Sequence, residues 1–372
     1  MTLRFPLAAA LLLGACADAG PGPAGAIVLD SAALAALPEL RVEPGVLVCT
    51  ALGQDGCPLR AAVANRLADG GIALWEPGLT IHRFGAGDTA GTPLGQAGPG
   101  GSYLNAMAIA STGADRYRVV TYDGEWRALT LDASGEVRAT ELITNPGPLA
   151  AMGFVGSQPV LQRMRGWGGD TAGHLQVILL DRILDTAGTM VLDAPVPWLT
   201  GGTADLPPLP PLVASNPVWT LTDDGDLLWS PGDQFVVERR TRRGRVVWRL
   251  EGPASRAATT ALLDAREALL RTDPFRLPPS DEEIAAMRSR SDSLAPAVMG
   301  ITATPDARVI VSRGIAPDGS EVEFLRLAAD GTPDARFRLG QRTKILLAEG
   351  DSLLVHMPTE GEPWEVRWMR LR

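Results

Sequence analysis

The chain of 372 residues is longer than one small domain requires, and its 45% hydrophobic content excludes a disordered protein. Its 43 Asp and Glu residues outnumber its 34 Lys and Arg residues. The net charge of −9 argues against binding to nucleic acid, which requires a basic surface. The 41 Gly and 30 Pro residues indicate a chain with many turns.

The N-terminus has the layout of a secretory signal. Arg4 supplies a positive charge, and residues 5–13 form an apolar run that is too short to span a bilayer. We therefore expect residues 1–15 to be a signal peptide that is cleaved from the mature protein.

The four residues Leu13-Gly14-Ala15-Cys16 resemble the lipobox of bacterial lipoproteins. This resemblance implies that Cys16 is lipidated on its thiol and anchors the chain to a membrane, with residues 16–36 as lipidated N-terminus and tether. Because Ala17 rather than Asp follows the cysteine, it also implies the periplasmic side of the outer membrane. The alternative is an ordinary cleaved signal with a chance cysteine.

The other two cysteines, Cys49 and Cys57, are close in sequence. In the oxidising envelope of a bacterium we expect them to form a local disulfide. A free pair of thiols is an alternative, and so is a metal site, although no histidine lies nearby in the sequence.

The remaining sequence has a regular β rhythm. Short apolar segments alternate with turn signals such as Asp-Gly every ten or so residues, which predicts an all-β fold. Six repeating units can be distinguished, at residues 69–84, 103–142, 150–192, 219–250, 299–339 and 345–371. We predict a six-bladed β-propeller over residues 37–372, and five or seven blades remain alternatives.

Two features interrupt or complete this rhythm. Residues 253–293 have helical composition, with Ser280 and Glu283 as a capping box, and predict a helical insertion between blades 4 and 5. The last unit needs one more strand to cover the edge strand of its sheet. The segment 40–49, from the other end of the chain, is the natural candidate.

Five arginines lie just before the insertion: Arg239, Arg240, Arg242, Arg243 and Arg245. We interpret them as a solvated hairpin edge that discourages pairing with another chain. Binding of an anionic partner is the alternative.

These units resemble the six-bladed β-propeller lipoproteins of bacterial envelopes, a group related to NHL-repeat and TolB-like propellers. The resemblance rests on Asp69-Gly70 with the Gly-rich residues 95–100, on the insertion, and on the closing segments 350–355 and 364–371. The chain departs from the group at Gly101 and Ser102, where an acidic residue often stands. The resemblance implies a fold and a location more than an activity.

The sequence holds no phosphate-binding loop, nucleophile elbow or helical zinc motif. His82, His174 and His356 each lie within or beside an apolar strand. We interpret them as surface or core residues, with a metal site in the central channel as the alternative.

Some six-bladed propellers are calcium-dependent lactonases, which place Glu, Asn and Asp at the tips of inner strands, where oxygen ligands suit a hard cation. The candidate ligands are Asn105, Asn145, Asn216, Asp223 and Asp306. Each of them also suits a simpler role as a turn residue.

Because no convergent set of titratable residues can be recognised, we expect no resident cofactor and a non-catalytic scaffold that binds a protein, peptide or glycan. The first alternative is a calcium-dependent, lactonase-like hydrolase with its site in the central channel. The second is a structural envelope lipoprotein with no dedicated ligand.

Overall fold

The computed structural model describes residues 26–50, 57–58, 62–76, 79–113, 115–144, 147, 150–166, 172–184, 188–199, 210–253, 260–271, 278–315, 320–358 and 364–372. The predicted signal peptide, Cys16 and Asn145 lie outside these residues.

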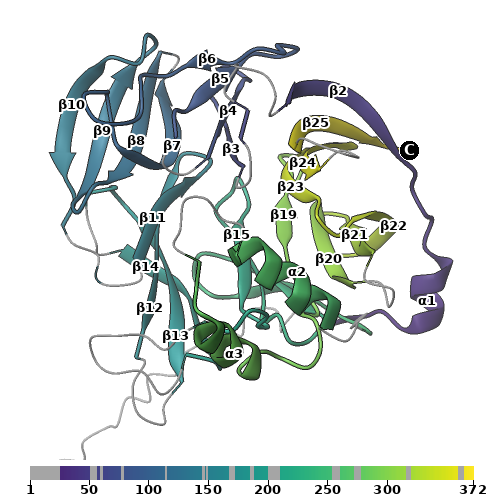
Figure 1. Ribbon diagram of the computed structural model, residues 1–372. Coiled ribbons are helices and arrows are strands. Elements are labelled where there is room, and N and C mark those ends of the chain that lie inside the picture. Colours follow the sequence, from purple (N-terminus) through teal and green to yellow (C-terminus); the bar gives the residue numbers. More distant parts are fainter. Residues whose placement is uncertain are drawn as a thin grey trace, which may run out of the picture.

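The described strands form six sheets, which are the blades of a β-propeller arranged around a central axis (Figure 1), and the four strands of each blade are antiparallel. Blade 1 contains β3 (Val63–Arg66), β4 (Ile72–Trp75), β5 (His82–Phe84) and β6 (Thr92–Pro93). Blade 2 contains β7 (Asn105–Gly113), β8 (Arg116–Tyr122), β9 (Trp126–Asp132) and β10 (Val137–Leu142). Blade 3 contains β11 (Ala150–Val155), β12 (Gln158–Arg165), β13 (Gly173–Leu180) and β14 (Gly188–Val196).

The second half of the ring repeats this pattern. Blade 4 contains β15 (Val218–Leu221), β16 (Leu227–Ser230), β17 (Val236–Arg240) and β18 (Val246–Glu251). Blade 5 contains β19 (Ile301–Ala303), β20 (Val309–Ile315), β21 (Glu321–Leu327) and β22 (Pro333–Gly340). Blade 6 contains β23 (Lys344–Glu349), β24 (Ser352–Pro358), β25 (Trp364–Leu371) and, on its outer edge, β2 (Val42–Thr50). The predicted six-bladed propeller is confirmed.

The core of the molecule lies between the blades. Six clusters of buried hydrophobic side chains each join two neighbouring blades, and together they run round the whole ring. Trp75 and Ile109 join blades 1 and 2, while Leu354 and Leu74 close the ring between blades 6 and 1. Burial of one such side chain contributes about 1.5–3 kcal/mol, so these clusters dominate the stability of the ring.

The N-terminal segment is a strap on the outside of blades 4, 5 and 6. It starts as β1 (Ile27–Val28), which pairs in parallel with β18. It continues through α1 (Ser31–Ala36), an isolated bridge from Glu39 to β22, and β2, which pairs with β25. The prediction that the segment 40–49 completes the last blade is confirmed. Part of the predicted tether therefore folds against the propeller body.

Between blades 4 and 5 lie α2 (Thr260–Arg271) and α3 (Asp281–Ser289), as the predicted insertion requires. The hydroxyl of Ser280 accepts a hydrogen bond from the backbone N–H of Glu283 (3.2 Å). The Glu283 carboxylate accepts one from the backbone N–H of Ser280 (2.8 Å), which confirms the capping box. Both helices lie together on one face of the ring (Figure 1).

The predicted disulfide between Cys49 and Cys57 is present, with a Cα–Cα distance of 5.5 Å. It joins the end of β2 to the segment that leads into blade 1, next to the seam where the ring closes. Of the described helices, none combines the length and the apolar composition that crossing a membrane would require.

Candidate functional site

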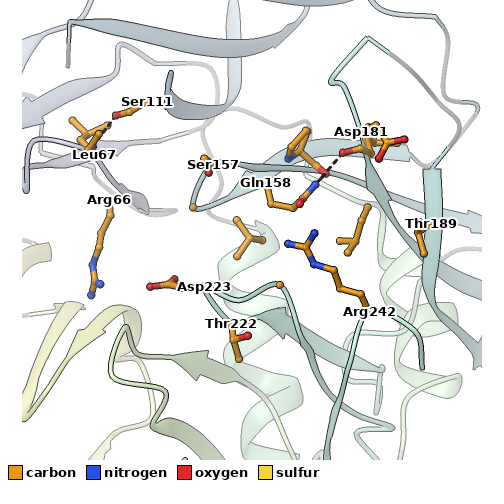
Figure 2. Close-up of a pocket in the computed structure, with 17 residues that line it drawn as sticks. Arg66, Leu67, Ser111, Ser157, Gln158, Asp181, Thr189, Thr222, Asp223 and Arg242 are labelled. Atoms are coloured by element: carbon orange, nitrogen blue, oxygen red, sulfur yellow. Dashed lines mark hydrogen bonds between the residues drawn. The ribbon is translucent and has the colours of Figure 1, made fainter. Parts of the chain in front are cut away.

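A cavity of about 610 Å³ lies at one mouth of the central channel (Figure 2). Its walls come from turns and strand ends of four blades. The turn after β3 contributes Leu67, the end of β7 contributes Ser111, the turn after β11 contributes Ser157, and the turn after β15 contributes Asp223. We call the face of the ring that carries this cavity the turn face.

The turn between β15 and β16 is held by hydrogen bonds within itself. Thr222 accepts from the backbone of Gly225 (2.8 Å) and, through its hydroxyl, from the backbone of Asp226 (3.1 Å). Gly225 has φ +78°, a conformation that favours glycine. A Cβ atom on Gly225 would also lie 2.2 Å from Nη2 of Arg242, so glycine leaves space for that guanidinium above the turn.

Polar side chains on β3 fix the rim of the cavity. Arg66 forms an ion pair with Glu349 (2.8 Å), which ties blade 1 to blade 6. Asn65 donates hydrogen bonds to the carbonyl oxygens of Ile109 (2.6 Å) and Gly156 (3.2 Å), which ties blade 1 to blades 2 and 3. The cavity therefore has walls that are bound to one another before any ligand arrives.

Three charged side chains in the wall remain available to a ligand. Asp181, Asp223 and Arg242 form no hydrogen bond or ion pair with any other residue that the structure describes. Figure 2 shows the Arg242 guanidinium extending into the cavity from the turn between β17 and β18. Gln158 donates its amide N–H groups to Pro159 (3.1 Å) and Leu180 (2.9 Å), so its carbonyl oxygen is left as an acceptor.

Besides the paired Arg66, the cavity thus presents the guanidinium of Arg242, two carboxylates, an amide oxygen and several hydroxyl groups. Such a wall can hydrogen-bond a polar ligand that carries both donors and acceptors. Asp181, Asp223 and Arg242 lie on three different segments, and none of them is hydrogen-bonded to another described titratable side chain.

The candidate calcium ligands lie at opposite ends of the inner strands. Asp223 lines the cavity, and Asp306 lies on the same face, where it forms an ion pair with Arg308 (3.2 Å). Asn105 and Asn216 lie on the opposite face, at or just before the first residues of β7 and β15. The structure therefore does not bring the four described candidates together.

The two asparagines already have partners. The side-chain amide of Asn105 donates to the carbonyl oxygen of Tyr122 (2.9 Å), and the side-chain oxygen of Asn216 accepts from Nε1 of Trp198 (2.5 Å). Within the described ranges, no group of three or more His, Cys, Asp or Glu side chains is placed to hold a metal ion.

The three histidines lie on three different blades. Nδ1 of His82 is 3.2 Å from the carbonyl oxygen of Thr80, and Nδ1 of His174 is 2.6 Å from a carboxylate oxygen of Asp193. His356 is buried in blade 6, where its ring stacks on Trp364 with 4.5 Å between the centroids. The described structure therefore places no two of them in a shared site.

Sequence reasoning did not single out Arg66, Gln158 or Asp181, and it grouped Arg242 with its neighbours on the hairpin. Of these neighbours, Arg239 forms an ion pair with Asp226 (3.0 Å) and is only slightly exposed, so the cluster is not one uniform basic surface. One sequence feature could have pointed to this site. The Asp-Gly turn after β15 marks the end of an inner strand, and this end lies on the turn face.

No model of a known protein family matches the chain, and no curated protein matches its sequence. Several solved structures resemble it in fold. A member of the DUF4221 family from Bacteroides vulgatus is 10% identical, with a TM-score of 0.46 over 90% of this chain and 97% of that chain.

Two others are similar at the same level. The PQQ-bound aldose sugar dehydrogenase from Streptomyces coelicolor is 11% identical, with a TM-score of 0.43 over 91% of this chain and 100% of that chain. The calcium-binding protein regucalcin from Agrobacterium tumefaciens is 11% identical, with a TM-score of 0.41 over 94% of this chain and 98% of that chain. At these identities and scores the likeness carries no argument about function.

Proposed function

We propose that the protein is a non-catalytic binding scaffold of the bacterial envelope that holds a protein, peptide or glycan partner on its turn face. The observation that carries this proposal is the cavity at the channel mouth, where Asp181, Asp223 and Arg242 are open to a ligand. The cross-links made by Asn65 and Arg66 keep its walls in place, which lowers the entropic cost of binding.

The separation of the charged groups favours binding over acid–base catalysis. A general base must lie within hydrogen-bond reach of the proton that it removes, and a nucleophile is usually paired with such a base. Asp181, Asp223 and Arg242 instead stand apart around the wall, as contacts for a ligand that extends across it.

Anchoring through lipid on Cys16 is part of this proposal. The strap begins with β1 on the outer edge of blade 4, away from the channel axis. We expect Cys16→Ser to abolish incorporation of labelled fatty acid and to move the protein from the outer-membrane fraction to the soluble periplasmic fraction. If the variant stayed in the outer-membrane fraction, Cys16 would not be the membrane anchor.

Peptide and glycan arrays probed with the Cys16→Ser chain test the scaffold itself. Binding should be weakened tenfold or more by Arg242→Gln or Asp223→Asn, because a lost charge-assisted hydrogen bond costs about 1.5–3 kcal/mol. Arg243→Gln is the matched control, because it removes the same charge from an exposed residue next to Arg242 that does not line the cavity. The proposal would be contradicted if neither Arg242→Gln nor Asp223→Asn weakened the binding seen on the arrays.

A further inference from the structure

A second cavity, of about 340 Å³, lies on the face opposite to the turn face. It lies between α2, the segment 210–214, the start of β15 and the segment 296–299 that leads into blade 5, and it is open to solvent. Since β15 begins at this cavity and ends at the first one, the two cavities are separate sites at opposite ends of the inner strands.

Most of the residues that line this second cavity are apolar, including Trp198, Pro211, Val218, Leu262, Val298 and Met299. Polar atoms nevertheless form a substantial part of its exposed surface. Transfer of an apolar ligand surface from water into such a wall is favourable by about 25 cal/mol per Å². Its volume is near the lower end of the range for small-molecule sites, which is roughly 300–1,000 Å³.

One wall is held firmly against the insertion. The backbone N–H of Val213 donates to the hydroxyl of Ser291 (3.2 Å), and its carbonyl oxygen accepts from the backbone of Asp292 (3.1 Å). The backbone N–H of Ser215 donates to the Asp292 carboxylate (2.8 Å). Leu212 and Val213 are buried against Met287 of α3. The apolar wall is therefore preformed.

Two polar groups in the wall are both hydrogen-bond donors. The side-chain oxygen of Asn216 is taken by the indole N–H of Trp198 (2.5 Å), which leaves the NH₂ group of Asn216 for another acceptor. Arg266 lies one helical turn after Leu262, so both side chains lie on the cavity face of α2.

The two acidic residues of α2 are each paired with another arginine. On α2, Asp264 and Glu267 pair with Arg288 of α3 (2.9 and 2.7 Å), and Glu267 also pairs with Arg271 (2.9 Å). Arg266 forms no hydrogen bond or ion pair with any other part of the chain that the structure describes. Its guanidinium lies at the edge of the cavity and has no partner among the described residues.

We propose that this cavity binds a carboxylate with a small apolar body. The apolar wall takes the hydrocarbon or aromatic part of the ligand. The planar guanidinium of Arg266 donates two parallel hydrogen bonds to the carboxylate, and the amide of Asn216 donates a further one. The same chemistry is offered by a free organic acid and by the C-terminal carboxylate of an apolar peptide.

Calorimetric titration of the full chain tests this proposal. The probes are octanoate, octanol as its uncharged counterpart, the tripeptide Leu-Val-Phe with a free C-terminus, and the same tripeptide as its C-terminal amide. We expect at least one carboxylate to bind roughly tenfold or more tightly than its uncharged counterpart. Binding of octanoate alone identifies a free acid as the ligand type, and binding of the free tripeptide alone identifies a peptide C-terminus.

Matched variants show whether the binding occurs in this cavity. Arg266→Gln should weaken carboxylate binding by the same factor of ten or more, and Arg243→Gln, an exposed arginine on the turn face, should not change it. Ala214→Phe should weaken binding by filling the cavity, and an unchanged circular dichroism spectrum verifies its fold. The proposal is overturned if no carboxylate binds at millimolar concentration, if charged and uncharged probes bind equally, or if Arg266→Gln has no effect.

Discussion

The side chain of His356 has only 1% of its surface exposed, and it stacks on Trp364 in the last blade. Burial lowers its pKa to about 4. A hydrogen bond with the backbone of Pro58 partly opposes this shift, and the nearby charge of Lys344 adds to it. Lys344 donates to the carbonyl oxygen of Ala62 (3.0 Å), and the loss of water around its ammonium group lowers its own pKa. In the folded propeller, the imidazole of His356 is therefore neutral at neutral pH.

This burial makes the stability of the protein depend on pH. An unfolded histidine titrates near 6.5, so between about pH 6.5 and 4 the unfolded chain binds a proton that the folded chain excludes. The His356 contribution to the free energy of unfolding is complete above pH 6.5. It is lost as the pH falls toward 4, by about 3 kcal/mol at most.

We expect His356→Phe, which keeps an aromatic ring next to Trp364, to remove this dependence. Urea unfolding at pH 7 and pH 5 should show that the wild type loses about 2 kcal/mol more than the variant over this interval. Any packing difference between the two proteins is the same at both pH values and cancels in the comparison. Equal losses would show that His356 is not the titrating group.

At the scale of elements, β2 closes the ring by covering β25, and the strand accommodates its partner through a bulge near Gly45. A Cβ atom on Gly45 would lie 2.5 Å from the backbone carbonyl oxygen of Trp368, closer than real contacts allow. Because that neighbour is backbone, it cannot move aside without disturbing the pairing of the two strands.

Gly45→Ala should therefore lower the free energy of unfolding by about 1–3 kcal/mol, the usual cost of overpacking. Gly113→Ala at the end of β7 is the control, because nothing lies within 4 Å of its new Cβ atom and its φ is ordinary for other residues. Chemical denaturation of both variants gives the comparison. Equal stability of the two alanine variants would contradict the tight approach at the closing strand.

The elements were predictable where the signal is local. Turn pairs such as Asp123-Gly124 and the capping box at Ser280 mark the ends of their own elements, and six repeats of such signals indicate the propeller. The two residues of β1 were not assigned, because their partner β18 lies more than two hundred positions further along the chain and gives no local signal.

The candidate site was less predictable for a related reason. Asn216 and Asp223 both stand near the tips of β15, but which face each tip occupies depends on the direction of the inner strand. Arg242 enters the cavity from a neighbouring hairpin of the same blade, and only the folded sheet brings that hairpin over Gly225.

At the scale of the whole molecule, the ring separates the candidate calcium ligands. A strand of four residues such as β15 spans roughly 13 Å, whereas ligands of one calcium ion each lie at about 2.3–2.6 Å from it. Asn216 and Asp223 at its two ends therefore cannot share an ion.

We expect excess calcium, compared with EDTA, to leave the thermal midpoint of the folded chain unchanged. A site of the lactonase type would instead stabilise the protein by about 2.7 kcal/mol at a hundredfold excess over its dissociation constant. Differential scanning calorimetry in the two buffers distinguishes these outcomes. A clear rise with calcium would favour the hydrolase over the scaffold.

Cross-linking in the intact envelope tests the binding role of the turn face most directly. A photo-reactive phenylalanine analogue replaces Thr189, which is exposed at the first cavity, or Tyr122, which is 41% exposed on the opposite face. A discrete adduct is expected from position 189, with loss of that adduct when Arg242→Gln and Asp223→Asn are added, and none from position 122. An adduct from position 122 alone, or one from position 189 that survives both substitutions, would contradict a partner held by the cavity.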